Sequence, residues 1–171
     1  FPELGRGKIP SDPFSFWPEP AWELYELLPA AGVMTSRGCP MRCTACASHR
    51  LNDAFERREP RDCVSAILNL AGRGARDIAF YDDALLLDAQ NHAAPIFAAL
   101  GDERAPARLH TPNGLHVREI TPELAALMRR AGMTTIRLSL ETASDEDARA
   151  RFSGKVSRDC FQQAVSALLG A

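Results

Sequence analysis

The sequence contains no apolar run long enough to cross a membrane and no pattern typical of a secretory signal peptide. It also has little net charge, formally −2 at pH 7, which argues against a dedicated nucleic-acid-binding surface. It lacks the spaced cysteines of a disulfide framework, because three of its five cysteines lie within eight residues, where thiols are poorly placed to pair. We therefore expect a protein of the reducing cytoplasm, with no membrane anchor and no specific contact with nucleic acid.

The composition is otherwise that of an ordinary globular protein. The 171 residues are 46% hydrophobic and 25% charged, which is enough for one domain with a hydrophobic core. Half of the twelve prolines fall within residues 1–30, which indicates an extended lead-in or linker before a folded domain at residues 31–171. Because the chain begins at Phe1, we expect it to be part of a longer protein.

Within residues 31–171, short β-rich runs alternate with amphipathic helical patterns. The β-rich runs cover residues 32–36, 77–81, 108–111 and 134–140, and helical patterns cover about residues 61–72, 89–100, 121–132 and 157–169. Four successive βα units predict an α/β fold with a parallel sheet. In the fourth run, Ile136, Leu138 and Leu140 alternate with polar residues, whereas a strand buried on both faces is apolar throughout. This alternation favours a partial (β/α) barrel with a cavity-lining inner face over a doubly wound sheet.

All four predicted strands end in polar or ligand-capable residues. The first is followed by the cysteine loop, the second by Asp82 and Asp83, the third by Asn113 and the fourth by Glu141. Because the carboxyl ends of parallel strands meet at one rim, these residues predict a single functional site.

The cysteine loop itself indicates a metal or cluster site. Cys39, Cys43 and Cys46 have the spacing C-x3-C-x2-C, and soft thiolates suit iron. A four-iron cluster normally takes four protein ligands, so three would leave one iron open, as a catalytic metal requires. The spacing leaves a second interpretation open, in which His49 is the fourth ligand of a structural zinc ion and the chain is a zinc-stapled binding module.

Residues 35–46 read Thr-Ser-Arg-Gly-Cys-Pro-Met-Arg-Cys-Thr-Ala-Cys, and they closely resemble the cluster loop of the radical S-adenosylmethionine (SAM) superfamily. Three further segments resemble strand ends of the subgroup linked to cobalamin-binding domains: Phe-Tyr-Asp-Asp at 80–83, His-Thr-Pro-Asn-Gly-Leu at 110–115 and Arg-Leu-Ser-Leu-Glu-Thr at 137–142. The resemblance covers about residues 31–171 in the right order. It implies a TIM-barrel-like partial (β/α) barrel, of which this chain holds about four of six βα units.

The resemblance also implies the residues of the site. Cys39, Cys43 and Cys46 would bind a [4Fe–4S] cluster, and SAM would chelate the fourth iron. The expected SAM contacts are the strand-end residues Asp82, Asp83, Asn113, Ser139 and Glu141. One of the two aspartates would accept hydrogen bonds from the SAM amino group, and the serine and glutamate would face the ribose hydroxyls. We expect Gly38 to allow a tight backbone turn, His110 to point at the same cavity, and His92 and His116 to lie on the surface or in loops.

As an activity, the resemblance implies reductive cleavage of SAM to methionine and a 5′-deoxyadenosyl radical, which acts on an unknown substrate. Its expected partners are SAM and an electron donor such as flavodoxin or ferredoxin. The lead-in suits a linker after a cobalamin domain, so cobalamin-dependent methyl transfer is an option for the full-length protein. This chain has no D-x-H-x-x-G motif, so cobalamin would require a domain absent from it. Two departures remain: Ala45 replaces the family's larger residue near adenine, and the missing fifth and sixth units predict a catalytically incomplete fragment.

Overall fold

The computed structural model describes residues 20–52, 54–152 and 156–171. Most of the predicted lead-in therefore lies outside the described residues, and the boundary at residue 30 stays a prediction. Within the described part of the chain, no helix has the length and apolar character needed to span a membrane.

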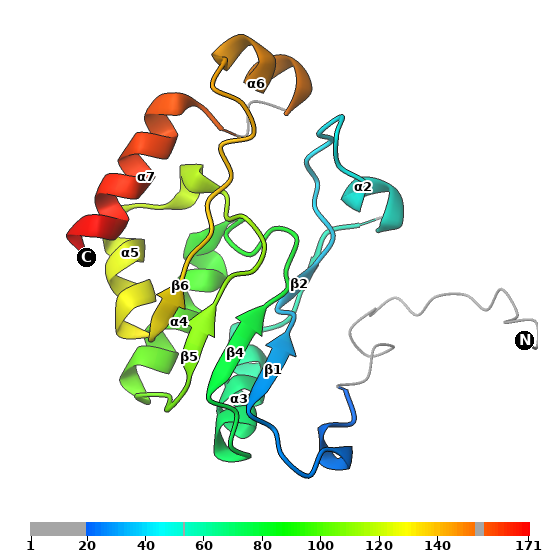
Figure 1. Cartoon of the computed structure of the whole chain (residues 1–171), viewed down its shortest axis with the longest axis vertical. Helices are drawn as coiled ribbons and strands as arrows, with labels where there is room; N and C mark the ends of the chain where they lie inside the picture. Colours follow the sequence, from blue (N-terminus) through cyan, green and yellow to red (C-terminus); the bar gives the residue numbers. More distant parts are fainter. Residues whose placement is uncertain (1–19, 53, 153–155) are drawn as a thin grey trace, which may run out of the picture.

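Four parallel strands form the central sheet (Figure 1). They are β1 (Ala30–Val33), β4 (Asp77–Phe80), β5 (Arg108–His110) and β6 (Met133–Thr135). Their order across the sheet is the same as their order along the chain. A doubly wound sheet would reverse this order at a switch point, whereas right-handed crossovers in a constant direction put every helix on one face. The predicted α/β partial barrel with four βα units is thus confirmed.

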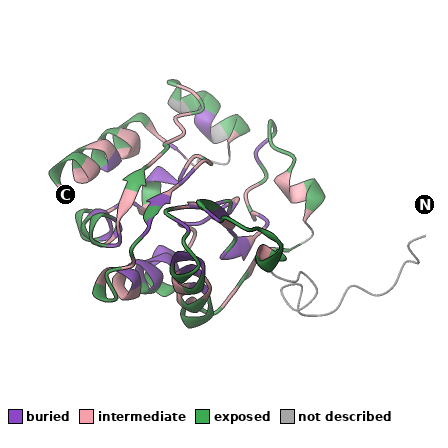
Figure 2. Cartoon of the chain, turned by 60° about the horizontal axis from the view of Figure 1, so that its bottom comes forward, coloured by how far each residue is buried: buried purple, intermediate pink, exposed green. Residues whose placement is uncertain are grey.

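A helix follows each of these strands and covers the same face of the sheet. The four helices are α3 (Pro60–Gly72), α4 (Ala93–Asp102), α5 (Pro122–Arg130) and α7 (Arg158–Gly170). Neighbouring helices pack against one another in chain order. The core lies between them and the sheet, where buried residues gather (Figure 2). Phe80 of β4 meets Phe97 of α4 edge-on, with ring centroids 5.9 Å apart.

Local chemistry explains the helix boundaries that the sequence predicted. Thr121 caps α5, because its Oγ1 accepts a hydrogen bond from Leu124 N at 3.2 Å, and Ser157 caps α7 in the same way through Cys160 N. Gly132 follows α5 with a φ of 88°, a conformation that favours glycine.

The fourth predicted strand, residues 134–140, is longer than the strand observed. The regular ladder of β6 ends at Thr135, because the register with β5 shifts between Leu109 and His110. Beyond this shift, the Thr111 hydroxyl replaces a backbone acceptor and binds Arg137 N at 3.1 Å. The chains still run together as far as an isolated bridge between Leu115 and Leu138.

The remaining elements are two to seven residues long, and none was predicted as a separate element, because runs this short carry little periodicity. They are η1 (Trp22–Leu24), β2 (Ser36–Arg37), α2 (Ser48–Leu51), β3 (Glu56–Arg57), η2 (Ala89–Asn91), η3 (Val117–Glu119) and α6 (Asp145–Arg151). Residues 89–91 and Ser36 do belong to the runs predicted at 89–100 and 32–36. Strands β2 and β3 pair antiparallel and enclose the cysteine loop between them.

Candidate cluster site

One cavity of about 120 Å³ gathers the three clustered cysteines with residues from other strand ends. Its lining residues are Cys39, Met41, Cys43, Ala45, Cys46, Ser48, Asp83, His116, Glu141 and Phe152. They come from the cysteine loop, from the segments after β4, β5 and β6, and from the end of α6. The predicted convergence of strand ends at one rim is therefore present in the fold.

The start of the cysteine loop is held in a tight turn. Gly38 has a φ of 78°, and a Cβ atom at this position would collide with the carbonyl oxygen of Ala54. Only glycine satisfies both constraints, as the sequence predicted. Arg37, just before this turn, pairs with Glu56 across the β2–β3 ladder. Its Nε also donates a hydrogen bond to Asn52 Oδ1 at 2.6 Å.

The remainder of the loop is held by contacts within itself and with the end of α6. Cys46 N donates to Cys43 O at 3.1 Å, and Thr44 N donates to Arg151 O at 2.9 Å, which ties the loop to the end of α6. Cys43 is buried, whereas Cys46 is exposed and its Sγ accepts a hydrogen bond from Ser48 N at 3.4 Å. The loop thus presents one sheltered and one accessible thiol to the cavity.

The two adjacent aspartates face opposite ways. Asp83 lines the cysteine cavity, whereas Asp82 is buried beneath the loop and accepts hydrogen bonds from Thr35 and Ser36. Burial raises the pKa of Asp82 above its usual value, against the opposing effect of these hydrogen bonds. The period of β4 explains the division, because Asp82 continues the buried parity of Ile78 and Phe80.

Asn113 and Ser139 lie outside the cavity lining. The Asn113 side chain donates to the carbonyl oxygens of Tyr81 and Asp82, at 3.2 and 3.1 Å, and so ties the end of β4 to the loop after β5. Ser139 lies against the backbone of Gly114, where a Cβ atom would collide with the serine hydroxyl.

Glu141 does line the cavity, and it does so in an unusual backbone conformation. Its φ is 59°, in the left-handed region that a residue with a Cβ atom adopts at a cost. Such residues are held in place by surrounding structure and are enriched at functional sites.

Comparison with known proteins places this geometry in a family. Residues 33–171 match the family model described as the Radical SAM superfamily. The chain belongs to this superfamily. No curated protein matched the sequence.

Among the solved structures that resemble this radical SAM chain in fold, three illustrate the likeness. Two are of TsrM from Kitasatospora setae, a radical S-adenosylmethionine methyltransferase, one with cobalamin and a [4Fe-4S] cluster and the other with tryptophan substrate and a SAM analog (aza-SAM). Both have a TM-score of 0.72 and 18% identity, and they align with 82% of this chain. The third is HydG, a maturase of the [FeFe]-hydrogenase, with a TM-score of 0.56, 15% identity and 82% of this chain covered. The chain spans 29%, 28% and 32% of these three chains, respectively, which is less than a third of each.

The cysteine cavity has the donor set of an iron–sulfur cluster, because three thiols line it and soft sulfur suits iron. Among residues 20–52, 54–152 and 156–171, no group of three or more His, Cys, Asp and Glu side chains converges on one ion. Each cysteine of a four-iron cluster ligates a different iron, so the three thiols surround the cluster and need not meet at one point. His49, the fourth ligand of the zinc interpretation, is not among the residues that line the cavity.

The cysteine cavity contains four residues that the sequence analysis did not assign to it: Met41 and Ser48 of the loop region, His116 and Phe152. His116 lies in the loop before η3, one of the two positions expected for it, but it is buried there and lines the cavity, and Phe152 closes the same cavity from the end of α6. His116 lies three residues after Asn113, so including the whole loop after β5 in the predicted site would have found it. Phe152 carries no local signal, because only the tertiary fold brings α6 to the cysteines.

His110 is also placed differently from the prediction. Its Nε2 contacts Asp77 Oδ1 at 2.9 Å, and Asp77 also binds the guanidinium of Arg108 through both carboxylate oxygens. These two partners hold the pKa of Asp77 at about 2. The group lies on the sheet rather than in the cysteine cavity.

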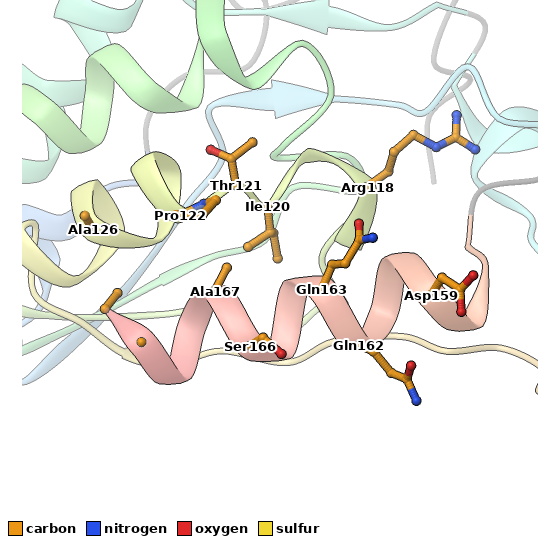
Figure 3. Close-up of a pocket in the computed structure, with 12 residues that line it drawn as sticks. Arg118, Ile120, Thr121, Pro122, Ala126, Asp159, Gln162, Gln163, Ser166 and Ala167 are labelled. Atoms are coloured by element: carbon orange, nitrogen blue, oxygen red, sulfur yellow. The ribbon is translucent and has the colours of Figure 1, made fainter.

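A second, larger cavity of about 1030 Å³ lies between η3, the start of α5 and α7 (Figure 3). Ile120 points from the loop toward α7, and Ala167 faces it from that helix (Figure 3). This cavity contains no cysteine or histidine and shares no residue with the cysteine cavity. Volume alone therefore does not mark the reactive site in this chain.

Proposed function

We propose that this chain is the N-terminal part of the catalytic barrel of a radical SAM enzyme. The observation that carries the proposal is the cavity that Cys39, Cys43 and Cys46 share with Asp83 and Glu141. When bound there, a [4Fe–4S] cluster supplies the electron that cleaves SAM to methionine and a 5′-deoxyadenosyl radical, which acts on an unknown substrate. The chain's own residues bind and orient the reactants.

Each polar residue of the cavity has a defined task in this proposal. The three thiolates hold the cluster and leave one iron for SAM. Asp83 accepts hydrogen bonds from the SAM ammonium group, because it is the strand-end aspartate that faces the cysteines and charge-assisted bonds are strong. Glu141 accepts from the ribose hydroxyls, and Ser139 supports that contact from the same segment. Asp82 and Asn113, expected as SAM contacts, have side chains engaged elsewhere, Asp82 with Thr35 and Asn113 with the carbonyl oxygen of Asp82.

The specific reaction is proposed for the full-length protein, because this chain spans less than a third of each related structure. We propose cobalamin-dependent methyl transfer for it, because the TsrM structures that share this fold are of a methyltransferase with cobalamin bound. We further propose reduction by an electron donor such as flavodoxin or ferredoxin, since Thr44, Ala45 and Cys46 are exposed on the cysteine loop. We also propose a cytoplasmic location, supported by the five free cysteines, which a reducing compartment would preserve.

The decisive experiment is anaerobic reconstitution with iron and sulfide, followed by EPR of the reduced protein with and without SAM. We expect about four irons per chain and a signal that changes when SAM is added. The matched pair of variants is Cys46→Ala and Cys160→Ala, because Cys160 lies in α7 outside the cavity. Only the first should lose iron.

Three outcomes would count against the proposal to different extents. Zinc binding through Cys39, Cys43, Cys46 and His49 without any cluster would make the chain a zinc-stapled binding module. A cluster whose signal ignores SAM would make it a catalytically incomplete fragment that retains ligation alone. Full iron content in Cys46→Ala would show that the cavity is not the ligand site.

Asp83→Asn tests the SAM contact separately from the cluster. We expect iron content to be unchanged and the SAM concentration for half of the EPR change to rise about tenfold or more, because a neutral amide replaces a charged acceptor. Asp102→Asn, an exposed substitution at the end of α4, is the control. Equal SAM responses in the two variants would remove Asp83 from the proposed site.

A further inference from the structure

Four polar residues form a buried group beneath the cysteine loop: Thr35, Ser36, Asp82 and His92, which we call the loop base. They are 1%, 0%, 3% and 2% exposed, respectively. Thr35 and Ser36 lead from β1 into the loop, Asp82 follows β4, and His92 precedes α4. Polar groups this deeply buried destabilise a fold unless they are hydrogen-bonded, so their contacts have to be examined one by one.

One oxygen of Asp82 makes most of these contacts. Its Oδ1 accepts from Thr35 N at 3.0 Å, from Thr35 Oγ1 at 2.7 Å, from Ser36 N and from Ser36 Oγ at 2.7 Å. Asp82 Oδ2 has no hydrogen-bond partner among the residues that the structure describes. The carboxylate thus binds two successive residues through both backbone and side chain, and it fixes the conformation of the segment that enters the loop.

His92 lies behind this contact and orients it. Its Nε2 is 2.9 Å from Thr35 Oγ1, whose single proton is already donated to Asp82. The imidazole must therefore donate through Nε2–H, and its neutral form suffices. Burial and the nearby charge of Arg57 lower the pKa of His92 to about 4, so the ring is neutral at pH 7. The hydrogen bonds run in one direction, from His92 through Thr35 to Asp82.

The backbone of Asp82 connects the loop base to the other side of the site. Asn113 donates to the carbonyl oxygen of Asp82 at 3.1 Å, and the next residue, Asp83, lines the cavity. On the loop side, Cys39 follows Ser36 by three residues, with the constrained Gly38 between them. The buried Asp82 therefore links the segment that leads to Cys39 with Asp83, which lines the same cavity.

We propose that Asp82 is a positioning residue that fixes the entry to the cysteine loop relative to Asp83, and that His92 orients it through Thr35. This inference rests on the proposed cluster and SAM site. Asp82 touches neither reactant and acts through the placement of Cys39 and Asp83. Cys43 and Cys46, the other two proposed iron ligands, lie further along the loop and are not part of this contact.

The first test is local and needs no cluster. Hydrogen exchange of the Thr35 and Ser36 amides should become at least about tenfold faster in Asp82→Asn, because the neutral amide oxygen is a weaker acceptor than a carboxylate. The Leu109 amide, which donates to Gly132 O in the sheet, reports global stability in the same sample. The matched control is Asp62→Asn, the same chemical change at an exposed site on α3.

The second test uses the reconstituted chain. In Asp82→Asn we expect iron content close to that of the wild type, with the SAM concentration for half of the EPR change raised about tenfold. His92→Gln, which can still donate to Thr35, should retain the wild-type response, whereas His92→Leu should lose it. A residue that only stabilised the fold would change Leu109 exchange and iron content together, without this split. Ser36→Ala, which removes one of the four donors, provides a milder variant if Asp82→Asn does not fold.

The proposal is overturned if the Thr35 and Ser36 amides exchange at the wild-type rate in Asp82→Asn, or if the SAM response is unchanged at full iron content. It is also overturned if these amides change only in parallel with Leu109. A wild-type chain that takes up no cluster would count against the proposed function alone, because hydrogen exchange still decides whether Asp82 holds the loop.

Discussion

The two ends of the cysteine loop differ in what holds them. At the loop base, every residue is buried and hydrogen-bonded within the fold. The loop tip, residues 39–46, is exposed over most of its length apart from Cys43, and few backbone hydrogen bonds support it. The difference indicates that the protein alone sets where the loop begins, and in the proposed function the bound cluster would complete the arrangement of the thiols. At such a site, the accurate placement of the ligands depends on the rigid loop base supporting the more exposed loop tip.

The largest effect is expected at the loop tip, where a substitution should remove the EPR signal of the cluster and leave the stability of the fold unchanged. Cys46→Ala should abolish the SAM-responsive EPR signal, because the exposed Cys46 at the tip is one of the three proposed cluster ligands. The free energy of unfolding of the metal-free protein should change by less than about 0.5 kcal/mol, as is typical of a surface substitution. Urea titration of the metal-free chain beside iron analysis measures both. A large loss of stability would mean that the tip is part of the core.

At the junction of base and tip, Gly38→Ala should destabilise the metal-free protein by about 2 kcal/mol or more. The substitution adds a strained φ and a collision with the Ala54 carbonyl. Gly72→Ala is the matched control, because a Cβ atom there meets nothing within 4 Å and lies in the last turn of α3, where alanine favours the helix. Urea midpoints of the two variants should move in opposite directions. Equal shifts would refute a special constraint at Gly38.

Much of this contrast could be read from the sequence. Parallel topology alone brings strand ends to one rim, so the meeting of the cysteines with Asp83 and Glu141 was predictable. The spacing around Gly38 indicated the tight turn. Even the inward orientation of Asp82 has a signal, because it continues the alternation of Ile78 and Phe80, although the sequence analysis did not use it.

Other features follow only from tertiary packing. Phe152 reaches the cavity because α6 folds over the loop, and nothing in residues 145–152 indicates that contact. The short ladder of β6 arises from a register shift against β5, which the regular alternation of residues 134–140 conceals. His92 also gives no sequence signal of burial, because its partner Thr35 lies 57 residues earlier in the chain.

The third prediction concerns the pH dependence of the loop base. Because the folded state lowers the pKa of His92 from 6.5 to about 4, the unfolded chain binds a proton first, and stability is lost as the pH falls from about 6.5 to about 4. The loss at the lower limit is up to about 3 kcal/mol. Asp82, whose pKa is raised, acts in the opposite direction, so the wild-type profile alone is ambiguous. The difference in the free energy of unfolding between wild type and His92→Gln, measured in urea, isolates the histidine, because Asp82, Arg57 and Asp88 are present in both proteins. A difference that does not vary with pH would contradict the assignment.

The smallest effect is expected at the exposed polar group of Asp77, Arg108 and His110, which sharpens the comparison by contrast with the loop base. Arg108 and His110 lower the pKa of Asp77 from 3.8 to about 2, so its contribution is present above about pH 4 and lost as the pH falls toward 2. Water and salt screen this solvent-exposed group, so Asp77→Asn should shift the urea midpoint at pH 7 far less than His92→Leu does, and added salt should reduce even that shift. The histidine contacts of both groups are 2.9 Å long, whereas the groups differ in burial and in the ion pair that Asp77 makes with Arg108. If Asp77→Asn instead matched the buried variant, hydrogen-bond geometry rather than burial would set the strength of the loop base.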